Sequence, residues 1–231
     1  MTSYVFSPAP QPAVAIFDSE QQFPVRRVFC VGRNYAAHAR EMGGDPDREE
    51  PFYFTKSAMA ITDSGTTIPY PAGTSNFHHE IELVIAIGKP GFELKQNDAL
   101  AMVFGYASGL DMTRRDLQFA ARDKGRPWSI GKDIEHGAII SPIRPAAETG
   151  HPTSGRIWLS VNDEIRQDSD LNDLIWSVPE IIAHLSRFYH LMPGDLIYSG
   201  TPEGVGPVVA GDRITGGVEG VADLELRIAA D

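Results

Sequence analysis

The sequence predicts a mainly β protein with few helices, an α+β chain whose short strands build a mostly antiparallel sandwich or rolled barrel. Its 22 glycines and 17 prolines are spread between short apolar runs rather than gathered in one tract. Turn signals such as Gly88-Lys89-Pro90-Gly91 and Pro193-Gly194-Asp195 separate these runs, which is typical of strands joined by tight connections. Apolar residues recur at helical spacing in few places, so the sheets are expected to supply most of the core.

Seven segments rich in β-branched or aromatic residues are expected to be strands. They are Arg27–Val31, Pro51–Lys56, Glu80–Ile87, Met102–Leu110, Arg156–Val161, Asp195–Ser199 and Asp223–Ile228. No internal repeat or low-complexity tract accompanies them.

Three helices are expected. Asn34–Met42 opens with an N-cap residue type and closes on Gly43-Gly44. Thr113–Arg122 begins with Thr113 and has Asp116 three residues later, a capping-box pattern. Val178–Tyr189 carries apolar residues at helical spacing and has a proline near its start.

The 231 residues are expected to form one domain over residues 26–231, preceded by an extended, proline-containing arm over residues 1–25. The single cysteine, Cys30, excludes an internal disulfide and indicates the cytoplasm. No apolar run approaches the ~18 residues of a membrane span. The net charge of −11 disfavours nucleic acid, which binds to basic surfaces. We therefore expect neither a membrane nor a nucleic acid as partner.

Two carboxylates stand on one face of the third expected strand. Side chains alternate along a strand, so Glu80 and Glu82 project together, with His78 on the same face, while Ile81 enters the core. Adjacent carboxylates repel each other unless a positive charge lies between them, and a hard divalent cation is a natural partner. The alternative is the solvated face of an edge strand.

A third carboxylate follows the next strand. Asp111, Arg115 and Gln118 are spaced to share one helical face. An arginine and an amide beside a carboxylate suggest a metal site with an anion clamp, because the guanidinium matches a carboxylate in a two-pronged contact. The alternative is a capped surface helix with ordinary charges.

Three further segments carry candidate chemistry. His38 and Glu41 lie three residues apart on a short helix, so the carboxylate can hold one imidazole tautomer and leave a base near neutral pH. Lys132 follows an apolar-aromatic run and either enters a pocket or is solvated. The glycine-rich loop 199–207 lacks the Lys-Ser/Thr ending of a phosphate loop, but its backbone N–H groups and the Thr201 hydroxyl could hold a carboxylate. Such a pair is common on helix surfaces, so alone it favours an ordinary helix surface over a catalytic pair.

The order of these motifs over residues 26–228 resembles that of the fumarylacetoacetate hydrolase family. The motifs are Gly32-Arg33-Asn34-Tyr35 with His38 and Glu41, His79-Glu80-Ile81-Glu82-Leu83, Gly109-Leu110-Asp111-Met112-Thr113 with Arg115 and Gln118, Lys132, and Ser199-Gly200-Thr201-Pro202-Glu203-Gly204-Val205-Gly206. The resemblance implies the mixed β-sandwich roll of that family's C-terminal catalytic domain, and a homodimer. It also implies Mg²⁺ or Mn²⁺ bound by Glu80, Glu82 and Asp111.

The resemblance further implies roles for the remaining residues. It makes His38, Glu41 and Lys132 catalytic, and it gives substrate contacts to Arg33, Arg115, Gln118 and Thr201. The chain is similar to the short acylpyruvase branch, which implies hydrolysis of the C3–C4 bond of a 2,4-diketo acid. Fumarylpyruvate, cleaved to fumarate and pyruvate in the breakdown of aromatic compounds through gentisate, is the expected substrate.

Two departures from the family pattern affect the substrate side of the pocket. Lys56-Ser57 stands where many relatives have Lys-Pro, and residues 133–136 follow Lys132 in a stretch that differs between activities. Decarboxylation of oxaloacetate and isomerisation of a hydroxy-dienedioate are the alternative reactions on the same metal motif. The His–Glu pair favours hydrolysis, because decarboxylation needs no activated water. A metal-stabilised β module that binds a partner without catalysis is the alternative of another class.

Overall fold

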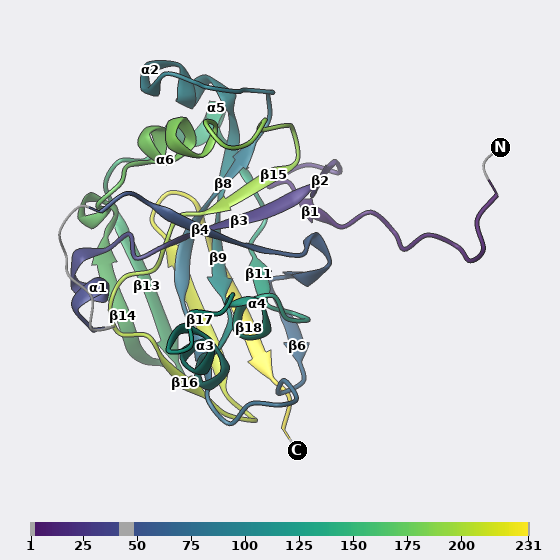
Figure 1. The fold of residues 1–231 in the computed structure, drawn as a ribbon, viewed down its shortest axis with the longest axis vertical. Helices are drawn as coiled ribbons and strands as arrows, with labels where there is room; N and C mark the ends of the chain where they lie inside the picture. The colour runs from purple at the N-terminus through teal and green to yellow at the C-terminus, as the bar shows by residue number, and fades with distance from the viewer. Residues whose placement is uncertain (1–2, 42–48, 231) are drawn as a thin grey trace.

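The computed structural model describes residues 3–41 and 49–230, and strands dominate them (Figure 1). The largest sheet has the order β4-β3-β15-β8-β9-β11-β5, with β12 paired to β9. Its neighbours are antiparallel except for the parallel pairs β3–β15 and β5–β11. The bounds of its strands are β3 Arg27–Gly32, β4 Phe52–Lys56, β5 Ile61–Asp63, β8 Ile81–Ile87, β9 Val103–Asp111, β11 Ala138–Ile140, β12 Arg144–Pro145 and β15 Asp195–Tyr198.

A second sheet, of order β14-β13-β17-β18-β6, packs against one face of the first. Its strands are β6 Thr66–Ile68, β13 Arg156–Val161, β14 Glu164–Asp170, β17 Arg213–Val218 and β18 Ala222–Ile228. Two small sheets complete the β structure. They are the hairpin of β1 Ala13–Ala15 and β2 Gln22–Pro24, and the sheet of β10 Thr113–Arg114, β7 Phe77–His79 and β16 Gly206–Val208.

The central strand β8 is buried at all seven residues, so both faces of the large sheet are covered. Ile81, Leu83 and Ile85 enter the core between the two sheets. Val84 and Ala86 point the other way, into a second core. By the same alternation Glu82 points away from the second sheet. The carboxylates of this strand therefore face the side where loops and helices cover the large sheet.

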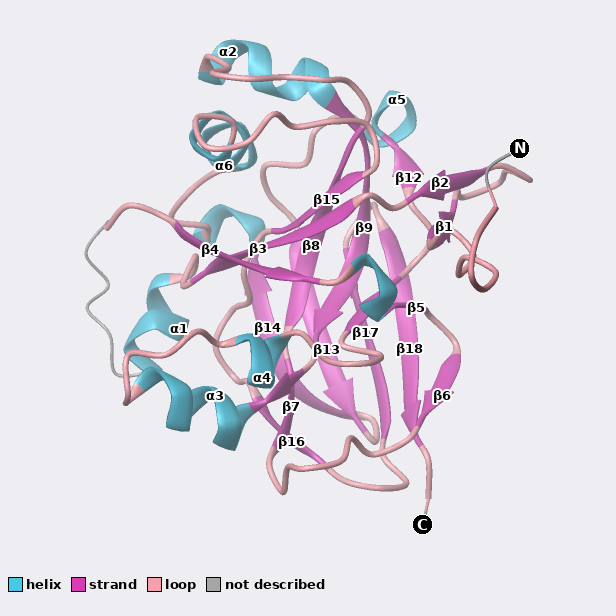
Figure 2. Ribbon diagram, turned by 45° about the vertical axis from the view of Figure 1, so that its right-hand side comes forward, coloured by secondary structure: helices cyan, strands magenta, loops and turns pink. Residues whose placement is uncertain are grey.

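The helices are short and lie at two ends of the molecule. In Figure 2, α2 and α6 lie at the top, whereas α1, α3 and α4 lie lower, with α3 and α4 beside β7. Their bounds are α1 Ala36–Glu41, α2 Gln96–Ala99, α3 Arg115–Arg122, α4 Ser129–Lys132, α5 Ala146–Thr149 and α6 Val178–Leu185, with 3₁₀ turns at Ala58–Ala60, Leu100–Met102 and Leu171–Asp173. In the described residues no helix is long and apolar enough to cross a membrane.

The structure confirms the predicted fold class and all seven expected strands, but it corrects one helix start. The helix expected from Thr113 begins at Arg115, because Thr113 and Arg114 pair with β7 as strand β10. The predicted capping box is absent there: the Thr113 hydroxyl donates to the Asp111 carbonyl oxygen. Asp116 instead accepts hydrogen bonds from Thr74 Oγ1 and the Ser75 N–H.

The other expected helices shift at their ends. The first starts at Ala36, and its expected end at Met42 lies outside the described residues. The last ends at Leu185, four residues earlier than expected, and its start carries a capping box between Ser177 and Glu180.

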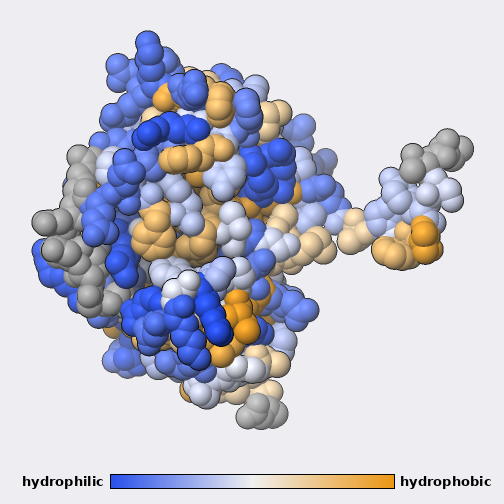
Figure 3. Space-filling view, in the orientation of Figure 1, coloured by the Kyte–Doolittle hydropathy of each residue, from blue (hydrophilic) through white to orange (hydrophobic). Residues whose placement is uncertain are grey.

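The N-terminal segment behaves as two parts. Residues 3–10 form an arm that extends away from the body (Figure 3). Tyr4, Val5 and Phe6 of this arm are exposed, whereas Gln11 and Pro12 hydrogen-bond to Val25 of the body. Residues 13–24, expected as part of the arm, form the β1–β2 hairpin, and its Val14 and Phe23 are buried in the second core. The packed body therefore begins near Ala13.

Candidate active site

Three buried carboxylates meet where β8 begins and β9 ends. Glu80 directly precedes β8, Glu82 is its second residue, and Asp111 is the last residue of β9. One oxygen of each lies within 4.8 Å of the others. The antiparallel register, with Glu82 opposite Gly109, creates this meeting point, and Gly109 itself packs closely under Tyr198 and Val84, where a Cβ would lie 2.6 Å from either side chain.

Buried cations neutralise two of these carboxylates. Lys132 Nζ lies 2.6 Å from Glu80 Oε2 and 2.7 Å from Asp111 Oδ2. Arg115 Nη2 pairs with Glu80 Oε1, while its Nη1 donates to Gln118 Oε1 at 2.5 Å. Lys56 Nζ lies 2.8 Å from Asp111 Oδ1 and also donates to the carbonyl oxygen of Met112.

The pKa shifts of Glu80 and Glu82 show which of the two carboxylates lacks a neighbouring positive charge. Burial alone would raise the pKa of Glu80, but the charges of Lys132 and Arg115 outweigh it and hold that pKa below its ordinary value. Burial raises the pKa of Glu82 well above its usual range, and the charges of Asp111 and Glu80 raise it further. Glu82 is the carboxylate without a cationic partner among the described residues.

This donor set suits a divalent cation. Three carboxylate oxygens within 4.8 Å supply the hard ligands that Mg²⁺ and Mn²⁺ prefer. A cation at this point would also supply the charge that keeps Glu82 ionised. Glu82 Oε2 accepts the Gly200 N–H at 2.7 Å, which fixes the carboxylate orientation.

The histidine and its carboxylate stand on α1, above the acidic residues. His38 Nδ1 lies 3.2 Å from Glu41 Oε2, so Nε2 is the ring nitrogen left for the pocket. Burial opposes ionisation of Glu41, but the hydrogen bonds from His38 and the Gly204 N–H outweigh it and lower the pKa of Glu41. Glu41 is therefore an anion that can stabilise a protonated imidazole.

The glycine-rich loop after β15 contacts both groups. Gly200 N–H donates to Glu82, and Gly204 N–H lies 3.2 Å from both oxygens of Glu41. Both glycines have positive φ, and a Cβ at Gly204 would lie 2.0 Å from the carbonyl oxygen of Arg166. Thr201 lies between them, buried, and its Oγ1 accepts a hydrogen bond from Gln167 Nε2 at 2.9 Å.

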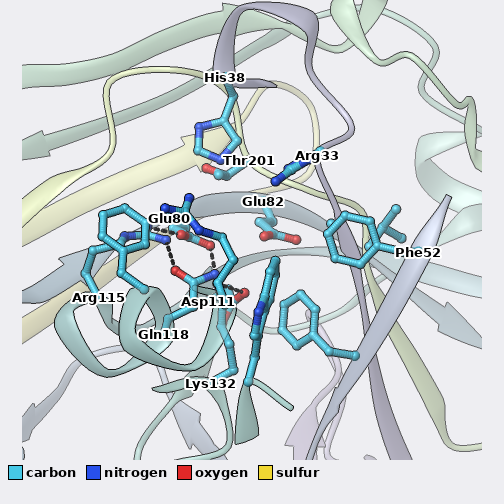
Figure 4. A pocket seen from close by; sticks show the side chains of 16 residues that line it. Arg33, His38, Phe52, Glu80, Glu82, Asp111, Arg115, Gln118, Lys132 and Thr201 are labelled. Atoms are coloured by element: carbon cyan, nitrogen blue, oxygen red, sulfur yellow. Dashed lines mark hydrogen bonds and ion pairs between the residues drawn. The ribbon is translucent and has the colours of Figure 1, made fainter. Parts of the chain in front are cut away.

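One pocket collects nine of the ten predicted site residues, and the tenth, Glu41, contacts it through His38. Figure 4 shows Arg33 and His38 on one side of the carboxylates, with Lys132 and Gln118 on the other. The two alternatives for Lys132 are thereby resolved, because its ammonium is buried in the pocket. One spacing argument was wrong: Asp111 belongs to β9, so it shares no helical face with Arg115 and Gln118.

Some residues of the site had no signal in the sequence. Gln167 is buried in β14, where its Nε2 donates to Thr201 and to the Pro202 carbonyl oxygen while its Oε1 accepts the Ile81 N–H. His79 Nδ1 joins the same Oε1 at 3.0 Å. A lone glutamine in a polar strand is indistinguishable from a solvated one. The pocket also has four aromatic side chains and one arginine that sequence reasoning missed: Phe52, Phe54, Phe119, Trp128 and Arg122.

Fold and site together define a rolled β-sandwich that carries three clustered carboxylates suited to a divalent cation and a hydrogen-bonded histidine–glutamate pair. The family model of the fumarylacetoacetate (FAA) hydrolase C-terminal domain matches residues 27–229. The chain belongs to this family. A fumarylpyruvate hydrolase of Ralstonia sp. is 56% identical over 184 residues, which are 80% of this chain and 95% of that protein.

The chain is also similar to a solved structure of the same name and to a more distant relative of another name. The crystal structure of fumarylpyruvate hydrolase from Pseudomonas aeruginosa, in complex with Mn²⁺ and pyruvate, is 52% identical with a TM-score of 0.96, covering 99% of this chain and 100% of that one. The mitochondrial oxaloacetate tautomerase FAHD1 of Arabidopsis thaliana is 39% identical over 202 residues, covering 87% of this chain and 90% of that protein.

Proposed function

We propose that this chain is a divalent-metal-dependent hydrolase that cleaves the C3–C4 bond of a 2,4-diketo acid, with fumarylpyruvate as its substrate. The observation that carries the proposal is the His38–Glu41 pair above the carboxylates of Glu80, Glu82 and Asp111. The similarity to fumarylpyruvate hydrolases supports the choice of substrate. It also supports a place for the reaction in the degradation of aromatic compounds.

The carboxylate triad and its cations bind the 2-oxo acid end of the substrate. A divalent cation held by Glu80, Glu82 and Asp111, Mg²⁺ or Mn²⁺, would supply positive charge for the carboxylate and for the negative charge that develops beside it. Arg115, Gln118 and the Thr201 hydroxyl line the same end and orient this group. Buried charges of this kind are strong because water is excluded.

His38 activates the water. Its Nε2 takes a proton from water, whose oxygen adds to the C4 carbonyl carbon, and Glu41 stabilises the imidazolium that forms. When the tetrahedral adduct collapses, the C3–C4 bond breaks and its electron pair passes to C3, giving the enolate of pyruvate and an acid. Lys132 places a positive charge beside that enolate. The proton held by His38 then returns to C3, so the products are pyruvate and fumarate.

The test is a coupled product assay. With Mg²⁺ or Mn²⁺ present, fumarylpyruvate should lose its enol absorbance and yield pyruvate and fumarate in equal amounts. Pyruvate and carbon dioxide from oxaloacetate, with fumarylpyruvate untouched, would indicate decarboxylation instead. Interconversion of the enol and keto forms of oxaloacetate, without cleavage of any diketo acid, would make the chain a tautomerase. No reaction with any of these acids would contradict an enzymatic role.

We also propose that the enzyme is a cytoplasmic homodimer. The free, buried thiol of Cys30 supports a reducing compartment. Three apolar side chains of the arm, Tyr4, Val5 and Phe6, are exposed and become buried if the arm packs on a second copy. Light scattering should give twice the chain mass for the full chain, and deletion of residues 1–10 should weaken the dimer. A monomer at micromolar concentration would contradict the proposal.

A further inference from the structure

Two arginines that line the pocket, Arg33 and Arg122, have no acidic partner across it among the residues that the structure describes. The acidic residues that line the described pocket are Glu80, Glu82 and Asp111, and they lie at its inner end with Lys132 and Arg115. Arg33 forms no ion pair with any described residue. Arg122 pairs only with the exposed carboxylate of the next residue, through Nε. Its terminal guanidinium nitrogens make no hydrogen bond to a described residue.

Aromatic rings hold both guanidinium groups in place. The Arg122 guanidinium carbon lies 4.5 Å from the centroid of the Phe119 ring, and that of Arg33 lies 5.9 Å from the centroid of Phe52. Arg33 adopts a left-handed backbone conformation, φ 55°, between β3 and α1, the helix that carries His38. The two arginines therefore belong to different elements. Arg122 is the last residue of α3, and Arg33 directly follows β3.

One wall of the pocket is aromatic, and its rings meet at steep angles of 88° between Phe52 and Trp128 and 53° between Phe54 and Trp128. Phe52 and Phe54 pack against Trp128, with ring centroids 5.3 and 5.9 Å apart. A Cβ at Gly32 would lie 2.0 Å from the ring of Phe52, so the glycine makes room for this wall. A planar, conjugated chain packs on such a surface with little loss of conformational entropy.

We infer that Arg122, together with Arg33, forms a subsite for a second carboxylate at the acyl end of the substrate. This inference rests on the proposed function. The 2-oxo acid end occupies the metal side, C4 lies beside His38, and the planar acyl chain passes along the aromatic wall to the two guanidinium groups. The pocket thus selects a diketo acid that carries a carboxylate at both ends, and it gains less from an acyl group that ends in a methyl.

A matched pair of substrates isolates this subsite. Fumarylpyruvate and 2,4-dioxohept-5-enoate have the same carbon chain, but the second ends in a methyl group in place of the far carboxylate. We expect Arg122→Gln to raise KM for fumarylpyruvate about ten-fold, because a charge-assisted hydrogen bond at a partly exposed site is lost. The kcat for fumarylpyruvate should change less than about two-fold, since uniform binding is removed. Arg33→Gln should change the kinetics in the same direction.

The control is Arg126→Gln, which removes the same charge from an exposed residue four positions away that does not line the pocket. It should leave both substrates unaffected. An Arg122→Gln enzyme that loses as much activity on the methyl-ended substrate as on fumarylpyruvate, or that keeps wild-type KM for fumarylpyruvate, would overturn the inference.

Failure of the proposed function has a different signature. If the wild-type enzyme hydrolyses neither compound, the proposed reaction is wrong. The subsite is then tested by calorimetric Kd values of the two compounds in the presence of Mn²⁺. The wild type should bind the dicarboxylate more tightly than its methyl counterpart, and Arg122→Gln should abolish the difference. Equal binding of both compounds by the wild type would refute the subsite.

Discussion

Replacing His38 or Glu41 separates the contribution of the base from that of its partner. His38→Ala removes the nitrogen that takes the water proton, whereas Glu41→Gln keeps an amide oxygen that still accepts the hydrogen bond of His38 Nδ1 at 3.2 Å. The glutamine variant therefore retains the imidazole and its tautomer but loses the negative charge beside it. Neither residue contacts the carboxylate triad in the structure, so metal affinity should survive both changes.

The expected magnitudes follow from the geometry. A positioned base contributes about 10²–10⁴ in rate, so His38→Ala should lower kcat/KM for fumarylpyruvate by that factor. For Glu41, two unit charges 3.2 Å apart interact by about 1.3 kcal/mol in bulk water and about 5 kcal/mol at an effective dielectric constant of ~20. Because the Glu41 side chain is 35% exposed, water screens the pair and the lower half of this range applies. We expect a loss of about 10- to 100-fold for Glu41→Gln.

The assay measures pyruvate release from fumarylpyruvate and, in parallel, calorimetric binding of Mn²⁺. Glu49→Gln, at an exposed carboxylate, is the control for loss of a negative charge. Any turnover of oxaloacetate should suffer less than hydrolysis, because it needs no activated water. Wild-type hydrolysis by His38→Ala would refute the assignment of the base. A variant that loses hydrolysis only because it no longer binds Mn²⁺ would refute the separation of base from metal site.

Three further changes test the surroundings of the triad. Glu82 has a raised pKa in the folded, metal-free protein, so its contribution to stability is complete below the unfolded pKa of about 4.3 and is lost as the pH rises through the folded value. In thermal melts with EDTA, Glu82→Gln should therefore stabilise the protein at pH 8 relative to wild type, and it should weaken stabilisation by Mn²⁺. An unchanged pH dependence would contradict this. Lys56→Met removes one of two cations beside Asp111, which keeps Lys132, so denaturant titration should show a loss of about 1.5–3 kcal/mol in the free energy of unfolding. A loss below about 1 kcal/mol would argue against that pair. Ser57→Pro suits the backbone, φ −58°, but removes the N–H that Asp133 accepts at 2.7 Å, so we expect a loss of about 1 kcal/mol that disappears when Asp133 is also changed to Ala. Equal losses in both backgrounds would show that the hydrogen bond contributes nothing.

Local patterns predicted the strands and the acidic cluster because both depend on the two-residue period of a strand. Glu80 and Glu82 share a face whatever the topology, and burial of Ile81 decides which face it is. The end of β9 at Asp111 was likewise visible as the end of an apolar run. The proximity of Asp111 to the glutamates needed the pairing of β8 with β9, which the sequence supplied only through the family resemblance.

Contacts between distant parts of the chain were beyond local reasoning. Thr113 favours a helix start by its residue type, yet pairing with β7 takes it into a strand, so tertiary structure overrides the local preference. Lys56 ends a strand like many solvated lysines, and only the tertiary structure, which brings Asp111 to it, shows that it is buried. The two departures from the family pattern, at Ser57 and Asp133, also proved to be one feature, because the backbone of the first donates to the side chain of the second.

The loop 199–204 connects site residues that lie far apart in the sequence. Asn34 Nδ2 donates to the carbonyl oxygens of Ser199 and Trp176, which ties the start of this loop to the segment that leads into α1. Farther along, Gly200 orients the carboxylate of Glu82 and Gly204 contacts that of Glu41. The peptide groups of this loop therefore set the distance between the three clustered carboxylates and the His38 base. Tautomerisation and decarboxylation would need only the carboxylates that bind the metal. Hydrolysis would also need the His38 base at a fixed distance from them. Within this fold, we expect the geometry of this loop to govern how much hydrolysis accompanies the reactions that need the metal alone.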